Sequence, residues 1–240
     1  MNMVCLVVLL HITAPAATAE GWEGAYRQAA LRYEITEAER LVARLRETDT
    51  SPAGETNRLL LARTLLLTAE WRRIDYEKLP PEDTEQRRPL GRAIDTAAQE
   101  TLDLLESFQE SAEIWRLRAD AYGTMIRTGH QAKKYLGKME AALDKAMQLE
   151  PENPRVLVSC ARRYLFADAG HGGDLDKAFG FLNKALEKAP DDEPALLLRG
   201  LAYQKADKQD QAILDWQQAL KNNPSCKPAY EELEKRGKLP

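Results

Sequence analysis

The sequence has few aromatic residues, few cysteines and no strong excess of one charge. Aromatics make up 7% of the 240 residues, and three cysteines are too few for a disulfide-stabilised scaffold. The 34 Lys and Arg against 38 Asp and Glu give a net charge of −4, so nothing indicates a nucleic-acid partner. A hydrophobic fraction of 44% with 30% charged residues excludes wholesale disorder and a polytopic membrane protein.

The one long apolar run lies at the start of the chain, over residues 3–12 (MVCLVVLLHI). A membrane-spanning helix needs roughly 20 residues, so no stable membrane span is expected. Ala17 and Ala19 occupy the small-residue positions before a signal-peptidase cleavage site. We therefore expect residues 1–19 to be a signal peptide, with Glu20 as the mature N-terminus and a periplasmic location. Two alternatives stay open, a buried N-terminal helix and a start codon further upstream.

Cleavage there would remove Cys5 and leave two cysteines. Cys160 falls in the middle of an apolar stretch, whereas Cys226 falls in a turn. An exported chain permits a disulfide, but these surroundings favour a buried, inert thiol at Cys160.

One spacing occurs three times in the second half of the chain. A small residue precedes a tyrosine by three positions, and an alanine in the following helix precedes a proline by five. The positions that define this repeat are Trp115, Ala119, Tyr122, Ala146, Pro151, Ala161, Tyr164, Ala178, Ala185, Pro190, Gly200, Tyr203, Ala212, Trp216, Ala219 and Pro224. Residues three apart share a helical face, where a small side chain lets a second helix approach. Each proline then ends its pair of helices.

This recurrence predicts an all-α fold, a right-handed α-solenoid of stacked antiparallel helix pairs with about eleven helices. Residues 20–110 are expected to form degenerate helix pairs, and residues 111–226 three repeats (112–153, 154–192 and 193–226). Residues 227–240 are expected to form a capping helix and tail. The first two repeats are longer than the third, and the added residues are expected in turns at 127–137 and 167–174.

The third segment, residues 193–226, resembles a tetratricopeptide repeat (TPR) in its length of 34 residues and in Gly200, Tyr203, Ala212, Trp216 and Pro224. This resemblance implies a protein that binds other proteins. The turn Gly172-Gly173-Asp174 is similar to a loop in the T component (TatT-like) family associated with TRAP transporters. That resemblance implies an accessory subunit that docks a periplasmic solute-binding protein.

Residues that could perform chemistry are sparse. His130 and His171 each lie alone in a turn, and no serine or cysteine has a local nucleophile motif. We therefore expect no catalytic residue, no metal and no cofactor. The glycines before Asp174 could bind an anion, but Asp174 as an N-cap with Gly173 at positive φ is the simpler interpretation.

The expected function is therefore that of a non-enzymatic scaffold in the cell envelope, with a protein or peptide as partner. The first helices of the repeats should line a concave groove, with some members in the core instead. The candidate groove residues are Arg116, Asp120, Val158, Arg162, Leu201, Gln204 and Lys205. Reversing the charge of Arg162 should weaken partner binding and leave the melting temperature unchanged. Homo-oligomer formation, the partner's identity and ligand binding by the expanded turns stay open.

Overall fold

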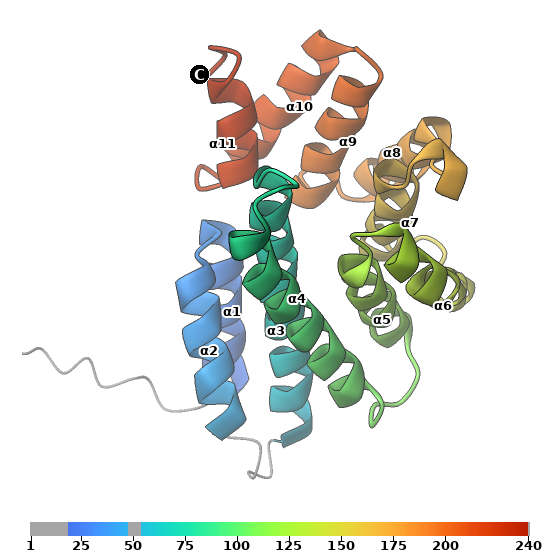
Figure 1. Ribbon diagram of the computed structural model, residues 1–240. Helices are drawn as coiled ribbons and strands as arrows, with labels where there is room; N and C mark the ends of the chain where they lie inside the picture. Colours follow the sequence, from blue (N-terminus) through green and yellow to red (C-terminus); the bar gives the residue numbers. More distant parts are fainter. Residues whose placement is uncertain (1–18, 48–53, 240) are drawn as a thin grey trace, which may run out of the picture.

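The computed structural model describes residues 19–47 and 54–239, which form eleven α-helices and no strand (Figure 1). The helices are α1 (Ala19–Arg32), α2 (Ile35–Glu47), α3 (Gly54–Lys78), α4 (Thr84–Leu105), α5 (Ala112–Met125), α6 (Gly129–Leu149), α7 (Pro154–Phe166), α8 (Leu175–Lys188), α9 (Glu193–Lys205), α10 (Gln209–Asn222) and α11 (Lys227–Glu234). A short 3₁₀ turn, Ala169–His171, lies between α7 and α8. Within the described residues, no helix is long and apolar enough to cross a membrane.

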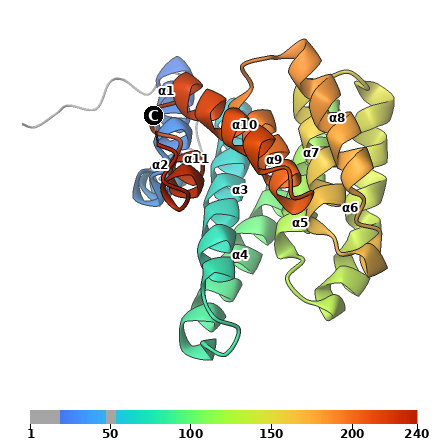
Figure 2. The same cartoon turned by 90° about the horizontal axis from the view of Figure 1, so that it is seen from above.

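Consecutive helices pack as pairs, from α1 with α2 to α9 with α10, and α11 packs on α10. The odd-numbered helices also contact one another in series, so α1, α3, α5, α7 and α9 form the inner layer of a curved array. Figures 1 and 2 show this array bending until α11 approaches the first two pairs. The all-α solenoid and the expected helix number are confirmed.

The residues that define the repeat are at the contacts between paired helices. Seven alanines of the pattern are at most 1% exposed: Ala119, Ala146, Ala161, Ala178, Ala185, Ala212 and Ala219. Each tyrosine contacts an aromatic ring on a neighbouring helix, with centroid separations of 6.1 Å for Tyr122–Tyr135, 5.9 Å for Tyr164–Phe181 and 4.8 Å for Tyr203–Phe179. Small residues thus bring the helices together, and rings cover the space beside them.

The two expanded turns differ from each other. The expected turn at 127–137 is wrong, because α6 already begins at Gly129. The Thr128 side chain is its N-cap and accepts a hydrogen bond from the backbone N–H of Gln131. The added residues therefore lengthen a helix. Residues 167–174 do form an extended connection, which ends where the Asp174 side chain caps α8, as expected.

The glycine assignment in this second turn is wrong. Positive φ occurs at Gly172 (78°), not at Gly173. Gly173 is required for a different reason, since a Cβ there would lie 2.1 Å from the Ala167 carbonyl oxygen. Arg163, whose side chain is 7% exposed, donates to the carbonyl oxygens of His171 (2.9 Å) and Gly172 (3.5 Å), so the turn is fixed to α7.

The first and last helix pairs contact each other directly. Tyr33, after α1, donates a hydrogen bond to Glu193 on α9. The Asn223 amide donates to Glu193 (2.6 Å) and to the Leu31 carbonyl oxygen (2.9 Å), and the Cys226 sulfur lies 3.9 Å from the Tyr33 hydroxyl. We refer to Leu31, Tyr33, Glu193, Asn223 and Cys226 as the clasp.

Candidate functional site

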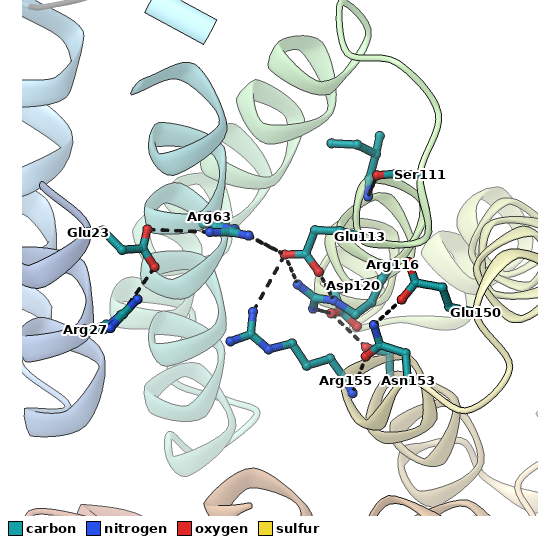
Figure 3. A network of polar contacts seen from close by, with 12 residues as sticks. Glu23, Arg27, Arg63, Ser111, Glu113, Arg116, Asp120, Glu150, Asn153 and Arg155 are labelled. Carbon is teal, nitrogen blue, oxygen red and sulfur yellow. Dashed lines mark hydrogen bonds and ion pairs between the residues drawn. The ribbon is translucent and has the colours of Figure 1, made fainter. Parts of the chain in front are cut away.

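The inner face of the array carries a network of charged side chains (Figure 3). Arg116 on α5 lies at its centre, 2.9 Å from Glu113 and 2.7 Å from Asp120. Asp120 also accepts a hydrogen bond from Ser159 on α7 (3.0 Å), and the Asp120 side chain is only 8% exposed. Both predicted groove residues on α5 are therefore occupied by contacts within the chain.

The network continues to the earlier helices. Arg63 on α3 lies 3.1 Å from Glu113 and 3.6 Å from Glu23 on α1. Figure 3 shows these side chains in a row across three inner helices, with Arg27 at one end. Arg155 on α7 lies beside the middle of the row, 4.0 Å from Glu113. Positive and negative charges alternate along the row, so each charge is close to one of opposite sign.

The network changes the acidity of its carboxyl groups in opposite directions. Burial favours the neutral form of Glu113, but hydrogen bonds from Arg116 and the charges of Arg116, Arg63 and Arg155 outweigh it and lower the pKa to about 2. At Asp120 burial is the larger effect, and it raises the pKa against the charges of Arg116 and Arg162.

Arg162 on α7 reaches across the inner face to α3. Its guanidinium lies 2.7 Å from Glu70, 92 residues away in sequence, so the two helices on either side of α5 are linked. Val158, one turn earlier, is 8% exposed and belongs to the hydrophobic core. The prediction that Val158 lines a groove is therefore corrected: its apolar side chain is more stable packed against the neighbouring helices.

The remaining predicted groove residues lie on α9. Leu201 is half-buried, the Gln204 amide donates to Glu232 on α11 (3.4 Å), and the Lys205 ammonium donates to the Leu165 carbonyl oxygen (2.8 Å). Lys78, at the end of α3, lies 2.9 Å from Glu231 on α11. Together with the pair of Arg162 and Glu70, these contacts join α3 to α7, α7 to α9, α9 to α11 and α11 back to α3. We refer to these four contacts as the circuit.

Two large apolar side chains stay exposed at this circuit. Ile74 is 40% exposed and follows Glu70 by one helical turn, and Phe166 is 48% exposed and follows Arg162 by one turn. The Lys205 ammonium lies 5.8 Å from the centre of the Phe166 ring. We refer to Ile74, Phe166, Leu201 and Lys205 as the rim surface.

Comparison with known proteins bears on the fold. The structure aligns with a thermophilic TPR protein of Thermus thermophilus over 91% of this chain and 100% of that chain, with a TM-score of 0.59 and 15% sequence identity. The chain has the TPR fold. YrrB, a TPR protein with an unusual peptide-binding site, aligns over 90% of this chain and 92% of its own at 12% identity, with a TM-score of only 0.42. No protein-family model and no curated protein matches the sequence.

Groups suited to chemistry are few in the described part of the chain. It holds no cluster of three or more His, Cys, Asp or Glu that could bind a metal. Cys160 and Cys226 are free and buried, and burial raises the pKa of each thiol to about 12. The buried thiol expected at Cys160 is confirmed. His171 lies in the 3₁₀ turn, 2.7 Å from Asp168 on the surface.

Sequence reasoning missed the inner face of α3, which contributes Arg63, Glu70 and Ile74. They are seven and four residues apart and therefore lie on one helical face, so a helical-wheel projection of the α3 sequence would have placed them together. No sequence signal indicates that Glu70 pairs with Arg162, because that contact depends on how strongly the array curves.

The structure changes the expected effect of reversing Arg162. In the Arg162→Glu variant a carboxylate would replace the partner of Glu70 and lie close to Asp120, so we expect a loss of about 2 kcal/mol of folding free energy. Urea unfolding checks this value. An unchanged midpoint would show that the pair with Glu70 does not stabilise the fold in solution.

Proposed function

We propose that this chain is a non-enzymatic scaffold that binds a segment of another protein at the rim surface. The observation that carries the proposal is the exposure of Ile74 and Phe166 on an inner face whose charged residues are mostly paired with one another. Exposed apolar side chains of this size beside charged groups are typical of protein interaction sites.

The rim surface also indicates the chemistry of the partner segment. Among the contacts of the described residues, the Lys205 ammonium meets one carbonyl oxygen and one aromatic ring but no carboxylate. Two of its three donors are therefore free for a partner. A segment with an apolar side chain next to an acidic residue fits this arrangement best.

We expect alanine in place of Phe166 or Ile74 to weaken partner binding by about tenfold or more, because truncated anchor residues cost on the order of 2 kcal/mol. The partner is first captured from envelope extract with a photo-crosslinking residue at position 166, and its affinity is then measured by calorimetry. Leu214→Ala is the matched control, since Leu214 on α10 is 65% exposed outside the rim surface. Equal affinity of Phe166→Ala and Leu214→Ala would refute the proposal.

The proposed location is the cell envelope, and it is supported by the expected signal peptide at residues 1–19. Residues 1–18 lie outside the described part of the chain, and α1 begins at Ala19. We expect the protein purified from its native source to begin at Glu20. Intact-mass measurement checks this, and a protein that retains the preceding residues would contradict export by this route.

A second candidate function is that of a T-component-like subunit of a TRAP transporter. The observation that favours it is the Gly172–Asp174 turn, which resembles the loop of that family and is held in place by Arg163. The captured partner separates the two candidates: a periplasmic solute-binding protein supports the transporter role, and an envelope assembly factor supports the general scaffold.

A further inference from the structure

A hollow of about 210 Å³ lies between α1 and α2, apart from the rim surface. Its apolar lining includes Ala29 and Leu41, which are 3% and 4% exposed. The charged residues that line it are Arg32, Arg40, Arg44 and Glu37. Three positive charges therefore face one negative charge across an apolar floor.

Only two of these four charged residues pair with each other. Glu37 pairs with Arg40 one helical turn away. No other carboxylate lines the hollow, and none pairs with Arg32 or Arg44 among the described residues. The unbalanced charge in the hollow is therefore carried by these two arginines, one from each helix.

Arg44 is also held in position. Its guanidinium carbon lies 4.6 Å from the centre of the Trp22 ring, and Trp22 is 6% exposed. A guanidinium stacked on a ring keeps its N–H donors in the plane of the group, where they can bind two oxygens at once. Because the indole is buried in the hydrophobic core, the cation needs little further ordering before it binds an anion.

We propose that the hollow binds a small organic carboxylate, whose oxygens are held by Arg32 and Arg44 and whose short alkyl chain contacts Ala29 and Leu41. The charge selects an anion, and the apolar floor selects a hydrocarbon body over a bare ion. The Gln28 amide, also in the lining, adds a neutral hydrogen-bonding group. This site is independent of the proposed function, because none of its residues belongs to the rim surface.

The test is an NMR titration of the ¹⁵N-labelled chain with butyrate, acetate and butyramide as probes. We expect butyrate to shift the amide signals of residues 25–32 and 37–44, acetate to bind more weakly for lack of an alkyl chain, and neutral butyramide to leave them in place. Arg32→Gln and Arg44→Gln should each raise the dissociation constant of butyrate by about fivefold.

Arg92→Gln is the matched control, since Arg92 is an exposed arginine on α4 away from the hollow. It should leave the dissociation constant of butyrate unchanged. Equal binding of acetate and butyrate, or equal effects of the Arg92 and Arg32 variants, would overturn the proposal and indicate adventitious anion binding only. Arg32 is exposed at the end of α1, so its variant keeps the test decisive even if Arg44→Gln disturbs the packing of Trp22.

Discussion

Replacing Gly200 with leucine is expected to destabilise the folded chain by about 3 kcal/mol or more, because it overpacks a closed helix contact. A Cβ atom at position 200 would lie 2.3 Å from Nε1 and 2.6 Å from Cδ1 of Trp216. Trp216 is fully buried, and its indole donates to the Leu197 carbonyl oxygen at 3.4 Å. The ring therefore cannot move aside without leaving its core position between α9 and α10.

Urea unfolding of Gly200→Leu and of Gly180→Ala measures this effect against a matched glycine. Gly180 is within α8, and a Cβ there would meet nothing within 4 Å. Alanine at this position should be neutral or stabilise the chain by up to about 1 kcal/mol, since alanine favours helix over glycine. If both variants lost the same stability, the close approach of α9 and α10 at Gly200 would be contradicted.

Replacing Arg116 with methionine is expected to cost about 3–5 kcal/mol, because it leaves a buried carboxylate without its partner. Asp120 would keep only the hydrogen bond from Ser159 and the more distant charge of Arg162. Methionine fills a similar volume, so the loss reports on charge more than on packing. The double variant Arg116→Met, Asp120→Leu removes the unpaired buried carboxylate and should recover the part of the loss that comes from Asp120, while Glu113 keeps its contact with Arg63.

The dependence of this loss on pH gives an independent check. Burial already raises the pKa of Asp120 in the folded state, and removal of Arg116 raises it further. A carboxyl group whose pKa is higher in the folded than in the unfolded state destabilises the fold once the pH rises above its unfolded pKa. The stability lost in Arg116→Met should therefore be smaller near about pH 4 than near about pH 7.

The control variant is Arg155→Met. It removes a side chain that is 67% exposed and 4.0 Å from Glu113, and it should change the stability by less than about 0.5 kcal/mol. A loss equal to that of Arg116→Met would contradict the central role of Arg116.

The parts of the fold that follow from local rules were predictable from sequence. The spacing of Ala212, Trp216 and Ala219 identifies a buried helix face, and prolines 154, 194 and 228 lie in the first turns of α7, α9 and α11. The start of α6 was missed because Thr128 followed by Gly129 resembles a turn, although it is an N-cap followed by the first residue of the helix.

The pairing of charged side chains on the inner face was not predictable from such local rules. It depends on pairs such as Glu70 with Arg162, whose residues lie on helices that are not neighbours in sequence. Repeat spacing determines which residues face inward, but not how far the array bends. A small change in the rotation between successive pairs would separate these partners and leave the same residues lining an open groove.

The clasp limits how the number of repeats in this chain can change by duplication or deletion. In an open array each repeat touches only its neighbours, so whole repeats can be duplicated or deleted at either end. Here Tyr33 and Glu193 bond across 160 residues, and Asn223 bonds Leu31. An inserted helix pair would carry α11 past α1 and break these bonds. Unlike an open array, this chain can keep the clasp only with its present number of helix pairs. Unfolding of one end should also break the contacts that hold the other end.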